Sequence, residues 1–222
     1  MILCAGPMAK VKLKISKGQI SADLKQAKGF SKAIIIANGA GAPMNSPFIS
    51  FFHTELNKLG YFTAKFNFFY QESGRKSPDR QPLLFEAYQA VLDKVKAESG
   101  LAEKDIVLGG KSMGGRIASM MISETKCKKL ILWGYPLHAP GKKDKLRDEH
   151  LYGLKGSQLF LQGTRDSLCD LDKLRPVLQK VKGAKLYIVE GGDHSLKVLK
   201  RGELTQEQAF ANCLSVINKF VK

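Results

Sequence analysis

This sequence has no long hydrophobic run. Its longest apolar candidate, Ala33–Ala37, has the length of a strand, whereas a membrane-spanning helix needs about 20 apolar residues. Residues 1–7 have neither the basic start nor the apolar centre of a secretory signal. We therefore expect no membrane span and no cleaved leader, and we regard residues 1–9 as a candidate disordered segment.

Cysteine is scarce and scattered. No two of the four cysteines have the spacing of metal ligands, and this density does not suggest a disulfide framework. They are Cys4, Cys127, Cys169 and Cys213. We expect a reducing, cytoplasmic setting, no metal site, and a buried structural role for Cys169.

Acidic residues are outnumbered, with 20 Asp and Glu against 36 Lys and Arg, so the formal net charge is +16. Such a charge attracts polyanions without specifying one. The aromatic pattern of an RNA-binding sheet and the known DNA-binding motifs are both missing. We expect a solvated basic surface and no nucleic-acid partner; a preference for anionic substrates stays open.

Two glycines are missing where nucleotide motifs need them. Residues 110–112 match the end of a phosphate-binding loop, but Asp105 stands at the position of its first glycine. Gly39 and Gly41 begin a dinucleotide fingerprint, which Met44 breaks. The sequence therefore predicts no nucleotide cofactor, and we expect no other cofactor.

The apolar patterns alternate between those of strands and those of helices. Alternation at Val11–Ile15 and a turn at Lys17-Gly18 predict a leading hairpin, and the unbroken run Ala33–Ala37 predicts a strand buried on both faces. The predicted strands are Val11–Ile15, Gln19–Leu24, Ala33–Ala37, Tyr61–Phe66, Asp105–Gly109, Lys129–Trp133, Ser157–Gln162 and Lys185–Glu190. The first predicted helix is capped by Ser46, has Pro47 in its first turn and ends at Leu59. The other predicted helices are Pro82 to about Ser99, Ser112–Ser123, Leu171–Val181 and Glu203–Lys222, with a polar loop at 70–81 and an irregular basic insert at 134–153. This order predicts one α/β domain over residues 1–222, with a doubly wound parallel sheet.

The most informative motif is G-x-S-x-G at residues 110–114. It lies between the apolar run Asp105–Gly109 and the helix-like segment Arg116–Met121, which is the context of a nucleophile elbow. The turn must be so tight that side chains in place of the two glycines would collide. We expect Ser112 to be a nucleophile at the carboxyl edge of the sheet; the alternative is an ordinary turn between a strand and a helix.

A serine nucleophile needs a base and an acid that orients the base. The strand Ser157–Gln162 is followed by Asp166, and the strand Lys185–Glu190 by His194. The chain order Ser112, Asp166, His194 is that of α/β-hydrolases. The alternatives are a helix cap or a partner of Arg165 for Asp166, and a loop residue without chemistry for His194. We expect Asp170 to cap the next helix and Asp193 to be structural.

The oxyanion hole should combine two backbone amides. We expect these to be Met113, directly after the nucleophile, and Ala40, in the turn after Ala33–Ala37; the alternative for that turn is an ordinary tight turn. The candidate substrate-binding residues are Gly39, Gly41, Lys111, Arg147 and His150. Arg147 and His150 could bind an anionic group, and a structural role for them is equally open.

These motifs resemble a family. The elbow, the loop Gly163-Thr164-Arg165-Asp166 and the loop Gly191-Gly192-Asp193-His194 resemble the dienelactone-hydrolase-like branch of the α/β-hydrolases. Together with the insert, Tyr135 to Gly141 and Leu146 to Leu151, they resemble more closely the predicted hydrolases grouped with animal testis-expressed homologues. The resemblance implies a mostly parallel sheet with an antiparallel leading strand, a Ser-Asp-His triad, no metal, no cofactor and no large lid. Asn38-Gly39 replaces the His-Gly of many relatives.

From these residues we expect a serine hydrolase that cleaves a small ester or thioester through an acyl-enzyme. Three alternatives stay open: a non-catalytic scaffold or binding protein, a small peptidase, and a nucleic-acid-associated protein suggested by charge alone.

Overall fold

The strands form one eight-stranded sheet in the order β1-β2-β4-β3-β5-β6-β7-β8. The computed structural model describes residues 8–222. Only β2 runs against the other strands, pairing antiparallel with β1 and with β4. The strands are β1 (Met8–Ile15), β2 (Gly18–Lys25), β3 (Ala33–Ala37), β4 (Phe62–Phe66), β5 (Ile106–Lys111), β6 (Lys129–Trp133), β7 (Ser157–Gly163) and β8 (Ala184–Val189). The predicted doubly wound, mostly parallel sheet is therefore confirmed.

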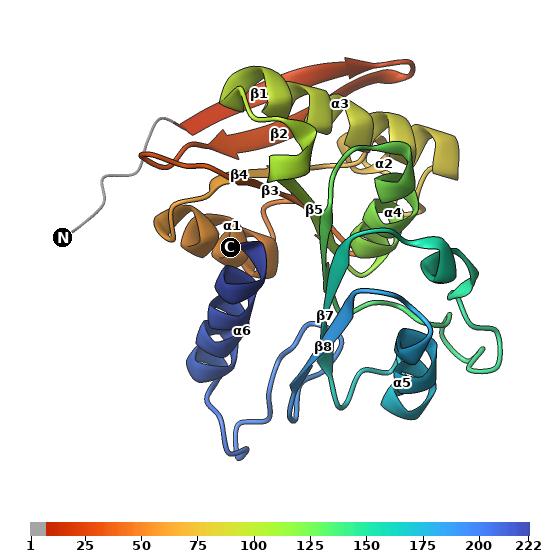
Figure 1. Ribbon diagram of the computed structural model, residues 1–222. Helices are drawn as coiled ribbons and strands as arrows, with labels where there is room; N and C mark the ends of the chain where they lie inside the picture. Colours follow the sequence, from red (N-terminus) through yellow and green to blue (C-terminus); the bar gives the residue numbers. More distant parts are fainter. Residues whose placement is uncertain (1–7) are drawn as a thin grey trace.

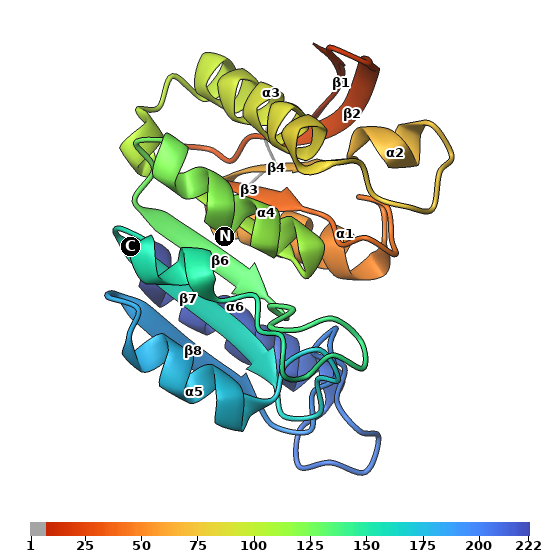
Figure 2. The same cartoon turned by 90° about the vertical axis from the view of Figure 1, so that its right-hand side faces the viewer.

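Helices cover both faces of the sheet (Figures 1 and 2). One face carries α3 (Gln81–Ser99), α4 (Met113–Met121) and α5 (Leu171–Gln179), and the other carries α1 (Pro47–Lys58) and α6 (Gln206–Val221). Each face has its own apolar core, because parallel strands with helices on both sides are buried on both sides. Every residue of β3 is fully buried, as its unbroken apolar run predicts.

Three local expectations were wrong. The polar loop expected at 70–81 begins with a short helix, α2 (Phe69–Glu72). The cap at Ser46 differs from expectation in one respect: Ser46 stands at the N-cap position of α1, but its side chain makes no capping hydrogen bond, and Pro47 follows in the first turn. Of the candidate disordered segment, residues 1–7 lie outside the described residues, whereas Met8 and Ala9 belong to β1.

The insert at 134–153 is short and mostly irregular. It contains an isolated bridge between His138 and Leu146 and ends in the 3₁₀ helix η3 (Glu149–Gly153). No large lid covers the described part of the molecule, as expected. In residues 8–222, no helix has the length and apolarity that crossing a membrane would require.

Candidate active site

Ser112 stands on a strained turn between β5 and α4. Its backbone has φ 53° and ψ −120°, a region that L-residues rarely adopt, and its N–H donates to Trp133 O at 2.9 Å. Only Ser112 and Leu196 combine a side chain with a positive φ in residues 8–222. Such strain persists where the surroundings enforce it, so the chain around Ser112 is built to present this side chain.

The two motif glycines have the steric reason that the sequence suggested. A Cβ on Gly110 would stand 2.5 Å from the backbone of Gly114, and one on Gly114 would stand 2.5 Å from Asn38 O. Both contacts are with backbone, which cannot rotate away. The glycines therefore let β5, α4 and the loop after β3 meet directly beneath Ser112.

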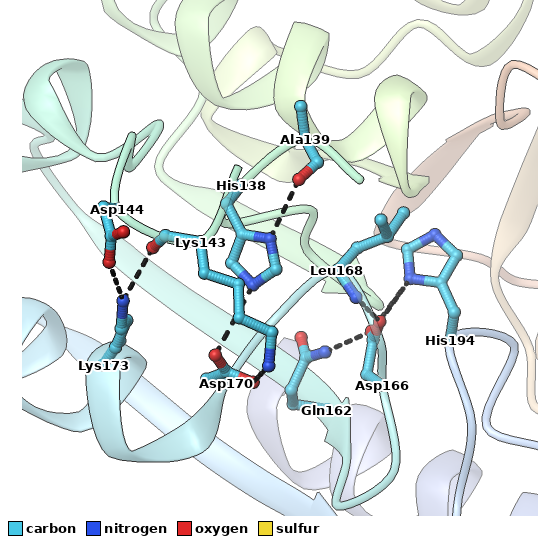
Figure 3. A network of polar contacts seen from close by, with 10 residues as sticks. All are labelled: His138, Ala139, Lys143, Asp144, Gln162, Asp166, Leu168, Asp170, Lys173 and His194. Carbon is cyan, nitrogen blue, oxygen red and sulfur yellow. Dashed lines mark hydrogen bonds and ion pairs between the residues drawn. The ribbon is translucent and has the colours of Figure 1, made fainter. Parts of the chain in front are cut away.

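The three predicted side chains meet above the carboxyl edge of the sheet. His194 Nε2 lies 2.8 Å from Ser112 Oγ, and His194 Nδ1 lies 2.9 and 2.8 Å from the two oxygens of Asp166. These separations are those of hydrogen bonds, and they fit an imidazole that donates from Nδ1 to the carboxylate and accepts at Nε2 from the serine hydroxyl. Figure 3 shows the imidazole facing the Asp166 carboxylate. The side chain of Asp166 is fully buried, and that of His194 is 22% exposed.

Gln162 belongs to the site and was not predicted from the sequence. This buried residue of β7 donates from its Nε2 to Asp166 Oδ2, and its Oε1 accepts from the backbone N–H of Tyr135 at 2.9 Å. The N–H of Leu168 donates to Asp166 Oδ1 at 2.8 Å. The carboxylate thus has donors on both oxygens, which fixes its orientation toward the imidazole. A glutamine inside a buried strand gives no local signal that it faces a carboxylate four residues later.

The loop after β3 lies against Ser112. A Cβ on Gly39 would be 3.4 Å from Ser112 Cβ, and no hydrogen bond among residues 8–222 uses the N–H of Ala40. Met113 is the first residue of α4, where a backbone N–H has no partner inside the helix. The amides of Ala40 and Met113 are therefore both unpaired close to the serine.

Side chains of α2 hold this loop. Tyr70 Oη donates to Ala40 O at 3.0 Å, and Gln71 Nε2 donates to Ala42 O at 2.8 Å. Asn38 Nδ2 donates to Gly39 O and to Ala42 O, at 2.8 and 2.9 Å. The helix that the sequence did not predict thus fixes the carbonyls of the loop.

A cavity of about 580 Å³ opens beside Ser112 and His194. Gly39, Gly41 and Lys111, three of the candidate substrate-binding residues, line it. The part of the cavity wall that the loop after β3 forms consists of small residues, Gly39 to Ala42. The cavity can therefore receive a group attached to a carbonyl positioned at Ser112.

An apolar groove of about 410 Å³ adjoins the cavity. Pro47, Phe48 and Ser195 line both, so the two spaces lie next to each other. The ring of Phe210 lies 5.8 Å from that of Phe48 and 4.9 Å from that of Phe51, and all three line the groove. We call this space, between α1 and the start of α6, the aromatic groove.

Arg147 and His150 do not line the cavity around Ser112. His150 Nε2 lies 2.9 Å from Ser119 Oγ on α4, and burial, together with the charge of Arg116, lowers the pKa of His150 to about 4. Tyr135 Oη donates to Arg147 O. The expectation that these residues reach a substrate at this cavity is not supported: His150 contacts α4, and the Arg147 carbonyl contacts Tyr135 within the insert.

The other polar candidates are structural in this arrangement. Asp193 Oδ1 accepts from the N–H groups of Ser195 and Lys197 at 2.7 and 3.0 Å, which shapes the loop that carries His194. Asp170 stands at the N-cap position of α5, as expected, and its carbonyl accepts from the N–H groups of Lys173 and Leu174. Its side chain makes no capping hydrogen bond and lies 3.1 Å from Lys143 Nζ (Figure 3). His138 is fully buried beside it.

The cysteines of the described part are buried and free. Burial raises the pKa of the Cys127 thiol to about 11 and that of Cys213 to about 12, and it also raises the pKa of Cys169. The expected buried state of Cys169 is confirmed; Cys4 lies outside the described residues. Over residues 8–222, no three or more His, Cys, Asp or Glu side chains gather in a way that could hold a metal ion.

Comparison with known proteins now gives the class of the chain. Residues 30–222 match the family described as alpha/beta hydrolase domain. Because the match covers most of the chain, the protein belongs to this family.

Solved structures agree on the fold. A dienelactone hydrolase from Anabaena variabilis is 16% identical, with a TM-score of 0.76 over 96% of this chain and 95% of that one. An esterase from Pyrococcus furiosus is 17% identical, with a TM-score of 0.75 over 97% and 89%. An alpha-beta serine hydrolase homologue from Coxiella burnetii is 19% identical, with a TM-score of 0.71 over 96% and 95%.

Proposed function

We propose that this protein is a serine hydrolase that cleaves a small carboxylic ester or thioester. The observation that carries the proposal is the contact of 2.8 Å between His194 Nε2 and Ser112 Oγ, on a serine whose φ is 53°. A base within hydrogen-bond reach of a strained, presented hydroxyl is the arrangement that activates a serine. Membership of the alpha/beta hydrolase domain family supports it.

In the proposed reaction His194 takes the proton of Ser112 as Oγ bonds to the carbonyl carbon. Asp166 holds the imidazole and stabilises its protonated form. The amides of Met113 and Ala40 donate to the oxygen that becomes negative. The carbon–oxygen or carbon–sulfur bond then breaks, and the leaving group takes the proton from His194. Water then attacks the acyl carbon as His194 takes its proton, and His194 gives that proton to Ser112 Oγ as the bond to the acid breaks.

The open geometry supports a small, soluble acyl substrate more than a peptide held by a gating domain. The cavity and the aromatic groove accept a short chain or one ring. The resemblance to predicted hydrolases grouped with testis-expressed homologues, the ester-or-thioester specificity and a cytoplasmic setting remain predictions.

The decisive test is labelling with a fluorophosphonate, which reacts with activated serines. The native protein is expected to be labelled and Ser112→Ala to be unlabelled. Ser123→Ala is the matched control, because this exposed hydroxyl follows α4 and bonds only to Met120 O. Absence of labelling in a folded native protein would instead favour a non-catalytic scaffold.

A further inference from the structure

Lys111 is the residue that precedes the proposed nucleophile, and its side chain lies on the opposite side of the sheet from α4. Gly110 faces α4, and successive residues of a strand point to opposite faces. Lys111 accordingly approaches α1, where its Nζ lies 5.8 Å from the centre of the Phe48 ring. Lys111 thus lines the cavity and approaches Phe48, which also lines the aromatic groove.

The cavity contains no carboxylate to balance this lysine. Among the residues that line it, only Lys111 and His194 carry ionisable groups. None of the ion pairs of residues 8–222 includes Lys111. A charged ammonium that faces a partly desolvated cavity without a partner is costly unless an anion joins it.

The two nearest acids are already engaged. Asp166 accepts from His194, Gln162 and Leu168 N–H, and Asp193 accepts from two backbone amides. Burial lowers the pKa of Lys111, while these two carboxylates act in the opposite direction. Neither acid forms an ion pair with the Lys111 ammonium, and Lys111 lines the cavity that a substrate would fill.

We propose that Lys111 is a specificity-determining residue that selects substrates carrying an anionic group, such as a second carboxylate, while an apolar arm of the same substrate lies in the aromatic groove. A role of Lys111 in substrate selection rests on the proposed hydrolase function. Binding of an anionic group by Lys111 does not depend on whether the protein turns over a substrate. The chemistry that fits is an acid with one anionic end and one aryl or alkyl end.

Two matched pairs of esters test whether Lys111 selects substrates for hydrolysis. Monomethyl succinate is compared with methyl butyrate, for an anion on the acyl side, and 4-acetoxybenzoate with 4-methylphenyl acetate, for an anion on the leaving-group side. In at least one pair, the ratio of kcat/KM for the anionic over the neutral ester is expected to fall about tenfold or more in Lys111→Met, as loss of a charged hydrogen bond predicts. Lys111→Arg should retain most of the preference.

The control is Lys145→Met, which removes the same charge from an exposed position of the insert. It should leave both ratios within about twofold, because exposed charges are strongly screened. Equal ratios in the native protein and Lys111→Met, for both pairs, would overturn the role of Lys111.

A binding experiment separates this inference from the hydrolase proposal. Calorimetric titration of Ser112→Ala with 4-phenylbutanoate should give a dissociation constant about tenfold lower than that of Ser112→Ala/Lys111→Met. Butanoate, which lacks the ring, should bind more weakly than 4-phenylbutanoate. If the native protein hydrolyses no ester but this binding difference holds, the hydrolase proposal fails and the anion site stands. Equal affinities in the two variants would refute the anion site, and equal affinities of the two acids would refute the groove.

Discussion

At the scale of single residues, the site depends on the imidazole of His194, which lies between the Asp166 carboxylate and the Ser112 hydroxyl. Asp166 contacts His194 Nδ1 through both of its oxygens, which leaves Nε2 without a proton and able to accept from Ser112. An amide in place of the carboxylate can present an N–H to Nδ1, which turns the imidazole into the other tautomer. In the proposed reaction, activation of Ser112 therefore depends on the negative charge of Asp166 as well as on its shape.

Asp166→Asn should lower kcat for ester hydrolysis by about 10⁴-fold while the protein stays folded. The measurement is steady-state hydrolysis of a short-chain ester, with circular dichroism to check the fold. Asp170→Asn, four residues later and outside the triad, is the matched control and should keep near-native kcat. A kcat of Asp166→Asn within tenfold of the native value would refute the role assigned to this acid.

Gln162 offers a second test. Replacement by Leu removes a donor from Asp166 and leaves the N–H of Tyr135 without its acceptor. Because an unpaired buried polar group costs about 1–3 kcal/mol, Gln162→Leu should lower the free energy of unfolding by about that amount, and kcat should fall as well. Urea denaturation at neutral pH measures the first effect. Unchanged stability together with unchanged kcat would show that this glutamine does not support the triad.

At the scale of elements, the elbow is a contact between three backbones: the end of β5, the start of α4 and the loop after β3. Gly114 is the point where α4 passes Asn38 O. Any side chain there must separate the helix from the loop that carries the Ala40 amide. The elbow thus couples the position of the nucleophile to that of the proposed oxyanion hole.

Gly114→Ala should therefore destabilise the protein by about 1–3 kcal/mol, the usual cost of overpacking, and should lower kcat more than it raises KM. Thermal unfolding and ester kinetics measure both effects. Gly153→Ala is the control, because an added Cβ meets no atom within 4 Å there and the φ of Gly153 is not positive. If Gly114→Ala were as stable and as active as Gly153→Ala, the close packing of the elbow would be contradicted.

Much of this architecture could be predicted from the sequence because its signals are local. An unbroken apolar run such as Ala33–Ala37 predicts a buried parallel strand, and the ends of such strands share one edge of the sheet. That reasoning was sufficient to expect Ser112, Asp166 and His194 at the same edge. The distances between these three side chains depend on the folded structure and could not be predicted from the sequence.

The parts that could not be predicted depend on tertiary contacts. The helix α2 forms within a polar stretch, where Tyr70 and Gln71 find partners on the loop after β3. Asp170 is the N-cap residue of α5, but its side chain forms an ion pair with Lys143 of the insert instead of capping the helix. Gln162 is separated from its partner Tyr135 by 27 residues. None of these partners can be read from the neighbouring sequence.

At the scale of the whole molecule, buried histidines couple stability to pH. The pKa of His53 is lowered to about 3 by burial first and then by the charges of Lys65 and Lys25. Neither ring nitrogen of His53 has a hydrogen-bond partner within residues 8–222. The nearby carboxylate of Asp23 lies 3.9 Å from the imidazole and 3.7 Å from Lys65 Nζ. The folded protein therefore keeps His53 neutral.

The sign of the pH effect follows from proton binding. Between about pH 6.5 and pH 3 the unfolded chain binds a proton at His53 that the folded chain does not, so stability falls as the pH falls, by up to roughly 5 kcal/mol from this group. His53→Leu should flatten this decline in urea denaturation measured across that range. His150, whose pKa is about 4, should keep part of the slope. An unchanged slope in His53→Leu would place the acid sensitivity elsewhere.

The net charge of +16 acts on every anionic molecule that approaches. This long-range attraction should raise the rate at which an anionic ester reaches the site, and salt should weaken it, because the screening length falls from about 30 Å at 0.01 M to about 3 Å at 1 M. For 4-acetoxybenzoate, kcat/KM should therefore fall as salt is raised, whereas the value for 4-methylphenyl acetate should stay nearly constant. Lys111→Met removes one of 36 basic residues, so it should keep most of this salt dependence.

The two electrostatic contributions separate at high salt. Attraction by the whole surface is screened there, whereas a contact inside the cavity is screened much less. At about 0.5 M salt, the native protein and Lys145→Met should still have a higher kcat/KM for the anionic ester than for the neutral one. Lys111→Met should show no such preference at this salt concentration. If the preference disappeared with salt in all three proteins, the basic surface alone would account for anion selection.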